Sequence, residues 1–105
     1  MKIKPGEVWL ADLGIAGKIR PVVIVSREDS NAPRALVIYV PFTTKSRASA
    51  YEVGLGKLPF LNEASIANVQ GIASIPETRL ERKLGNLPTD LLAKIKDAVR
   101  FALDL

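Results

Sequence analysis

The sequence predicts a mainly β domain of the α+β class, a small antiparallel β-barrel with one C-terminal α-helix. Short runs rich in β-branched residues fill the first two-thirds of the chain, and turn-forming residues separate them. The last segment instead spaces its apolar residues as a helix does. Because the 105 residues contain no repeat, linker or low-complexity tract, we expect one domain over residues 1–105.

The expected strands follow one another along the chain. They are residues 7–13, 21–26, 35–42, 51–55 and 66–72. The polar segment 27–34 joins the second and third strands and is expected to be a hairpin loop. Because these two strands are apolar at almost every position, we expect burial on both faces or cover from a partner subunit.

The last third of the chain contains one ambiguous segment and one clear helix. Residues 75–85 fit either a short helical turn or a strand. After Pro88, Thr89 is expected to cap a helix, with Asp90 favourable in its first turn. The residues expected on its apolar face are Leu91, Leu92, Ile95, Val99, Ala102 and Leu103.

The composition narrows the possible chemistry. The chain contains no cysteine and no histidine, so thiolate catalysis, disulfides and histidine acid–base chemistry are excluded. We expect no metal site and no cofactor, and the cysteine usage fits a reducing cytoplasm. No signal peptide or membrane-length apolar run is present, so a membrane partner is not expected.

The net charge of +4 lies wholly in the first half of the chain. Residues 1–50 hold eight basic and four acidic side chains, whereas residues 51–105 hold seven of each. Such an excess favours a polyanionic partner such as nucleic acid, although ordinary solubility charge is the alternative explanation.

The expected hairpin brings Arg20 and Thr43 together. If pairing is symmetric about the loop 27–34, these two residues oppose each other, about 5 Å apart on one sheet face. A slip of one residue would substitute Thr44. An arginine and a threonine at strand ends are also common as plain surface residues. The neighbours that would surround the pair with positive charge are Lys18, Lys45 and Arg47.

Five segments in order resemble the MazF/PemK toxin family. They are GEVWLAD (6–12), RPVVIVS (20–26), VPFTTK (40–45), the Ser65 to Ile72 stretch, and SIPETRL (74–80) followed by Gly85. The resemblance implies a CcdB/PemK-like, SH3-like barrel that forms a homodimer. It also implies a metal-independent, sequence-selective endoribonuclease for single-stranded RNA, an mRNA interferase, inhibited by a cognate antitoxin. Operator DNA would be a partner of the toxin–antitoxin complex.

The resemblance places the family's catalytic arginine and threonine at Arg20 and Thr43. The further residues expected to bind RNA are Lys18, Thr44, Lys45, Arg47 and Gln70. One departure concerns the loop 14–19, which is shorter than usual in the family and lacks an acidic residue. Since this loop covers the RNA groove in the family, its shortening bears on sequence preference and on catalytic strength.

The chemistry expected of the pair is charge stabilisation. A guanidinium can bind two phosphoryl oxygens, and a threonine hydroxyl can donate to the same oxygens. The base is unassigned: Asp12 and Glu77 are candidates, whereas Glu28 and Asp29 lie at the far end of the hairpin. We therefore expect a slow enzyme that depends on positioning. Candidate stacking residues are Trp9, Tyr39, Phe42, Tyr51 and Phe60, the first three more simply explained as core.

Three alternatives stay open at this point. The first is a non-catalytic barrel that inhibits DNA gyrase, as CcdB does. The second is a catalytically weak relative that only binds RNA or DNA. The third is an SH3-like interaction module without nucleic-acid chemistry.

Overall fold

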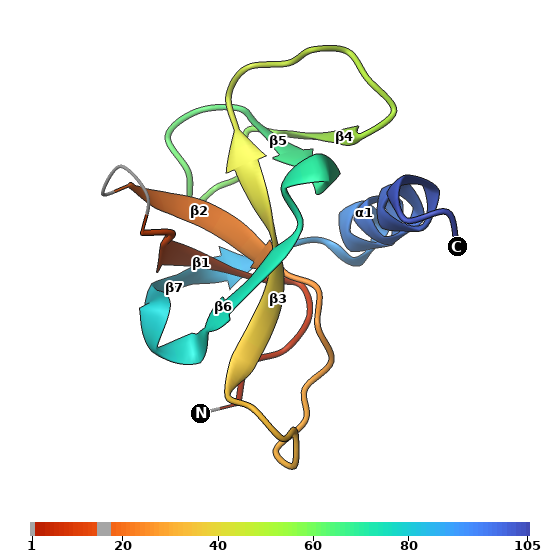
Figure 1. Ribbon diagram of the computed structural model, residues 1–105. Helices are drawn as coiled ribbons and strands as arrows, with labels where there is room; N and C mark the ends of the chain where they lie inside the picture. The colour runs from red at the N-terminus through yellow and green to blue at the C-terminus, as the bar shows by residue number, and fades with distance from the viewer. Residues whose placement is uncertain (1, 15–17) are drawn as a thin grey trace.

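The computed structural model describes residues 2–14 and 18–105 (Figure 1). The strands are β1 (Glu7–Asp12), β2 (Ile19–Ile24), β3 (Leu36–Thr43), β4 (Glu52–Gly56), β5 (Ser65–Asn68), β6 (Ala73–Pro76) and β7 (Leu80–Asn86). Two 3₁₀ turns, η2 (Val69–Gly71) and η3 (Glu77–Arg79), flank β6, and the helix α1 (Thr89–Ala102) ends the chain. All described strand pairs are antiparallel, so the predicted mainly β fold with a C-terminal helix is confirmed.

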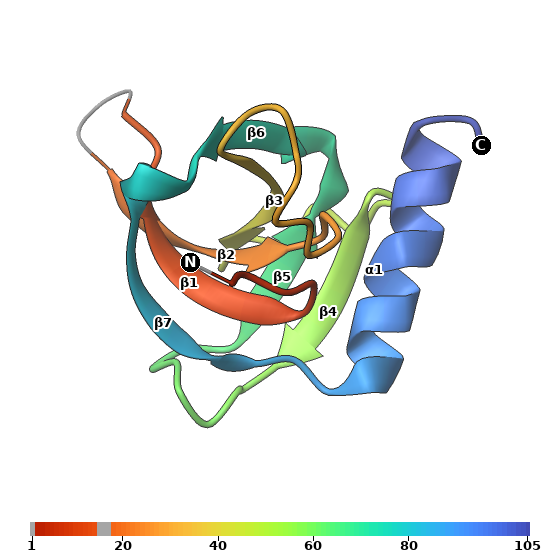
Figure 2. The same cartoon turned by 90° about the horizontal axis from the view of Figure 1, so that it is seen from below.

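The strands form one strongly curved sheet in the order β4-β5-β3-β2-β1-β7. β3 crosses the whole molecule and changes partners along its length, from β2 and β6 at its start to β5 at its end (Figure 1). The hydrogen-bonded order does not return from β7 to β4 in the described residues. The sheet is therefore strongly curved, as Figure 2 shows, but it is not a closed barrel in the described residues.

Both faces of β2 are buried from Val22 to Ile24, as its continuous apolar sequence predicted, whereas β3 leaves Leu36 and Ile38 exposed. One cluster contains Val23 and Val40 and is covered by α1, whose Ile95 is fully buried. Figure 2 shows α1 standing along this side of the sheet, beside β4. The opposite cluster contains Val22 and Ile24. Successive residues of β2 thus pack into the two clusters in turn. Every position from 22 to 24 is therefore buried and apolar.

Several local predictions need correction. Residues 66–72 are not one strand, because β5 ends at Asn68 and its side chain accepts from the Gln70 N–H to begin η2. The ambiguous 75–85 segment contains both a 3₁₀ turn and a strand. Thr89 makes no capping hydrogen bond, since the helix begins at Thr89 itself after Pro88. Leu103 lies past the helix end and is half-exposed rather than part of its buried face.

The negative charge of the buried Glu7 on β1 is balanced by two neighbouring side chains. Its carboxylate accepts a hydrogen bond from Trp9 Nε1 at 3.0 Å and lies 3.5 Å from Lys83 Nζ. A buried carboxylate is stable only when it is paired in this way. No helix in the described part of the chain combines the length and apolar character needed to span a membrane.

Candidate functional site

The β2–β3 hairpin has the register predicted from its loop. The facing pairs are Val22 with Pro41, Val23 with Val40, and Ile24 with Tyr39. Regular pairing stops at Pro41, which has no N–H to contribute to the ladder. Extending the same register by two residues places Arg20 opposite Thr43. The predicted register is therefore confirmed as far as Pro41. Beyond it β2 and β3 separate, although Arg20 is still paired with β1 and Thr43 with β5.

Arg20 and Thr43 line a single open cavity of about 340 Å³. The cavity lies where β2 begins and β3 ends. Figure 1 shows these two strand ends in its upper part. Its lining residues are Arg20, Pro21, Phe42, Thr43, Thr44, Lys45 and Ser65. Two cations and three hydroxyl groups thus share one hollow that contains no carboxylate. This composition suits a phosphate group, which needs positive charge and hydrogen-bond donors.

The hydrogen bonding of Thr43 leaves its proton available. Thr43 Oγ1 accepts from the backbone N–H of Lys45 at 3.2 Å, so the hydroxyl proton can be donated elsewhere. The ion pairs of the described residues are Glu7–Lys83 and Asp97–Arg100. Arg20 and Lys45 therefore have no carboxylate partner within this part of the chain, and both charges are available to a ligand.

The register places the pair beside residues of the neighbouring strands. Across the sheet, Arg20 faces Ala11 of β1, and Thr43 faces Ile66 of β5. Ala11 is fully buried, whereas Arg20 and Thr43 are partly exposed. The two site side chains therefore lie where the sheet face passes from core to surface.

The other predicted RNA-binding residues, Lys18, Arg47 and Gln70, do not line the cavity. Lys18 is exposed at the end of the β1–β2 connection, where its carbonyl accepts from Leu13 N. Arg47 lies in the loop after β3, and Gln70 is exposed on η2. Residues 15–17 of the shortened loop 14–19 lie outside the described residues.

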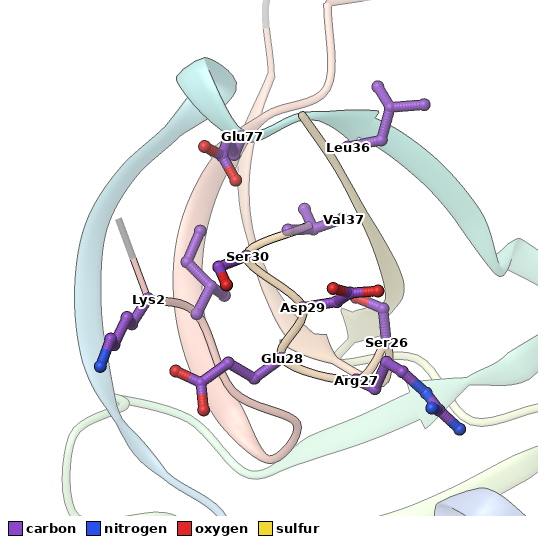
Figure 3. Close-up of a pocket in the computed structure, with 10 residues that line it drawn as sticks. Lys2, Ser26, Arg27, Glu28, Asp29, Ser30, Leu36, Val37 and Glu77 are labelled. Carbon is purple, nitrogen blue, oxygen red and sulfur yellow. The ribbon is translucent and has the colours of Figure 1, made fainter. Parts of the chain in front are cut away.

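A second cavity, of about 280 Å³, lies at the far end of the same hairpin (Figure 3). Glu77 reaches it from η3, while Glu28 and Asp29 reach it from the hairpin loop (Figure 3). Glu77, a candidate base, therefore lines this cavity and not the one that contains Arg20. Asp12 does not line the Arg20 cavity either, and its Oδ1 accepts from Gly14 N.

Ser65 lines the cavity but was not among the predicted site residues. It is buried at the start of β5, and its Oγ donates to the Glu63 carbonyl at 3.2 Å. The signal that pointed to it was the family-like stretch that begins at Ser65. Tyr39 and Phe42 are buried core residues, as expected. Trp9 is half-buried with its indole bound to Glu7, and Tyr51 packs against Phe101 with ring centroids 5.2 Å apart.

Among the described residues, no three aspartate or glutamate side chains lie close enough together to hold a metal ion. The fold and the cavity define a class of protein. It is a small curved-sheet domain that offers a guanidinium, an ammonium and hydroxyl groups to an anionic ligand at an open strand end.

Comparison with known proteins shows the family. The model of the PemK-like, MazF-like toxins of type II toxin–antitoxin systems matches residues 4–103, and the chain belongs to this family. It is 30% identical to the endoribonuclease MazF6 of Mycobacterium tuberculosis, over the full length of both proteins.

Solved structures agree with this assignment. A mycobacterial endoribonuclease in complex with its cognate antitoxin is 29% identical, with a TM-score of 0.85, covering 98% of this chain and 96% of the other. The Mycobacterium tuberculosis toxin MazF-mt6 is 30% identical, with a TM-score of 0.82, covering 97% and 98%. The recognised family is therefore supported by both sequence and fold.

Proposed function

We propose that this chain is the RNA-cleaving toxin of a toxin–antitoxin pair, acting on single-stranded RNA at short sequences without a metal. The observation that carries the proposal is the cavity in which Arg20, Thr43 and Lys45 meet in the absence of any lining carboxylate. The endoribonuclease names of the full-length relatives support it. They do not favour the alternatives of a gyrase inhibitor or a purely structural module.

The reaction begins with attack of a ribose 2′-oxygen on the adjacent phosphorus. The new O2′–P bond forms while the P–O5′ bond breaks, which leaves a 2′,3′-cyclic phosphate and a 5′-hydroxyl end. Arg20 binds two phosphoryl oxygens and stabilises the charge that gathers on them, and the Thr43 hydroxyl donates to the same group. The 2′-hydroxyl proton passes to solvent, and the Lys45 ammonium protonates the leaving 5′-oxygen.

The remaining candidates extend this site into an RNA path. Thr44 lines the cavity, and Lys18, Arg47 and Gln70 are exposed side chains that can contact phosphates and base edges along an extended strand. Their roles follow the family resemblance. The proposed compartment is the cytoplasm, where messenger RNA is translated.

The proposed partners are a cognate antitoxin, a second copy of the chain and, for the toxin–antitoxin complex, operator DNA. A related structure holds an endoribonuclease with its cognate antitoxin. A homodimer is supported by an apolar groove between the sheet and α1, lined in part by Val25, Ile38 and Val99. Ile38 is 44% exposed, which is unusual for a central strand residue and favours cover by another subunit.

The test is cleavage of a long RNA by purified protein in EDTA. We expect cuts at defined sites, with cyclic phosphate ends, that are lost in Arg20→Ala and Thr43→Ala. Arg34→Ala is the matched control, because it removes an exposed arginine in the hairpin loop, far from the cavity. Intact RNA with wild-type protein, or loss of cutting in EDTA, would contradict the proposal.

A further inference from the structure

One carboxylate holds the loop that follows Thr43. Glu52, the first residue of β4, is half-buried and accepts from the Arg47 backbone N–H through both oxygens, at 3.0 and 3.2 Å. Its Oε1 also accepts from Ser46 Oγ at 3.4 Å. The side chain of Glu52 therefore binds the turn that carries Ser46 and Arg47, and the loop is tied to the sheet at this point.

The loop depends on this support because its backbone is strained. Ala48 has φ of 50°, a left-handed conformation that costs a residue with a Cβ free energy. Its N–H is bound to Ser46 Oγ at 3.1 Å, the same hydroxyl that donates to Glu52. A strained conformation persists only where the surrounding contacts determine it. Here those contacts lead directly to the Glu52 carboxylate.

The same loop presents the cations of the site. Lys45 lines the Arg20 cavity and donates its backbone N–H to Thr43 Oγ1. Arg47, two residues later, is the residue that Glu52 binds through its backbone. A shift of this turn would therefore move Lys45 and change the hydrogen bonding of the Thr43 hydroxyl.

Glu52 also lies on the sheet face that carries the pair. In the strand register, Glu52 faces Asn68 of β5, one step along from Gly54, which faces Ile66. Ile66 in turn faces Thr43. A bound RNA strand crossing this face would pass near the Glu52 carboxylate, whose negative charge repels phosphates.

We propose that Glu52 is a positioning residue: its carboxylate fixes the 44–51 loop so that Lys45, Arg47 and the Thr43 hydroxyl are held in place for RNA. The inference rests on the proposed RNA cleavage. It also predicts that removal of the Glu52 negative charge weakens RNA binding, the opposite of what charge repulsion predicts. By charge alone, removing an acid next to a polyanion tightens binding, whereas loss of positioning weakens it.

The experiment measures RNA cleavage and RNA affinity for Glu52→Ala, Glu52→Gln and Ser46→Ala. Affinity is measured with a 2′-O-methylated copy of an RNA that wild type cuts, so that the ligand stays intact. We expect Glu52→Ala to weaken binding and raise KM about tenfold. It should lower kcat as well, because the loop carries Lys45 and binds the Thr43 hydroxyl. Glu52→Gln should recover most of the loss, because its amide oxygen still accepts from Arg47 N.

Two further variants control for the loss of charge and for a failure of Glu52→Ala to fold. Glu28→Ala removes the same charge from the far end of the hairpin and should leave affinity unchanged or slightly increased. Ser46→Ala breaks the link between Glu52 and Ala48 without changing the charge, and it should weaken binding too, even if Glu52→Ala does not fold.

The possible outcomes distinguish failure of the positioning role of Glu52 from failure of the proposed RNA cleavage. Wild-type protein that leaves RNA intact refutes the proposed activity. The positioning role is refuted if wild type cuts RNA while folded Glu52→Ala, or folded Ser46→Ala, binds the methylated RNA as tightly as wild type does.

Discussion

Replacement of Arg20 tests the proposed chemistry most directly. The guanidinium lies in a cavity with Thr43 and Lys45 and has no carboxylate partner among the described residues, so its hydrogen-bond donors are free for phosphate. Loss of one preorganised donor to a developing charge costs about 3–4 kcal/mol, or about 10²–10³ in rate. We expect Arg20→Ala to lose at least this factor in kcat.

Arg20→Lys separates charge from geometry. Lysine keeps the positive charge but replaces the planar fork with a single ammonium, so one of two phosphate hydrogen bonds is lost. A hydrogen bond to a charged group contributes about 1.5–3 kcal/mol, which predicts a loss of about 10–100-fold in kcat. The lysine variant should therefore fall between wild type and Arg20→Ala.

The assay is single-turnover cleavage of a labelled RNA with protein in excess, followed by urea unfolding of each variant. Because Arg20 is partly exposed and unpaired, its replacement should change the free energy of unfolding by no more than about 0.5 kcal/mol. Arg20→Ala that cuts within threefold of wild type would refute the role. A large loss of stability in both variants would instead assign Arg20 to the fold.

Three further predictions address the hydroxyl, the packing and the assembly. Thr43→Val, which keeps the shape but removes the hydroxyl, should lower kcat about 10–100-fold, whereas Thr43→Ser should stay within about fivefold; equal losses would exclude a hydroxyl role. Gly85→Ala places a Cβ 2.4 Å from Phe60 Cδ2, so thermal unfolding should show a loss of about 1–3 kcal/mol, while Gly54→Ala, with nothing within 4 Å, should not be destabilised. Ile38→Glu should convert the proposed dimer to monomer in sedimentation experiments; an unchanged dimer would place the interface elsewhere.

The fold was predictable where hydrophobic periodicity is strong. The runs that became β2 and β3 are apolar on both faces because each face enters a separate core, and a symmetric loop was sufficient to predict their register. The end of β5 was not predictable in this way. Residues 66–72 look like a continuous strand, yet the strand ends at Asn68, whose side chain accepts a hydrogen bond from Gln70 N. The pattern of apolar residues does not predict such a local side-chain hydrogen bond.

The part of the candidate site that lies on the β2–β3 hairpin was predictable. Opposed strand positions brought Arg20 and Thr43 together, and Thr44 and Lys45, which were also predicted, follow Thr43 directly in the sequence. Ser65 was missed because it comes from β5, whose pairing with the end of β3 is a long-range contact without a local sequence signal. Glu52 was missed for a related reason: its partners are backbone groups of a loop whose conformation depends on Glu52 itself.

Charge counting along the sequence gave the correct partner class for an incomplete reason. The excess of positive charge lies in residues 1–50, but Lys2 and Arg27 of that half line the far cavity together with Glu28 and Asp29. What distinguishes the Arg20 cavity is the absence of lining carboxylates rather than an unusual number of cations. A polyanion is therefore directed to one end of the β2–β3 hairpin by where the acids are placed. We expect the hydrogen bonds between the Glu52 carboxylate and the loop to outweigh its repulsion of phosphate, and the RNA affinity of Glu52→Ala measures which effect is larger.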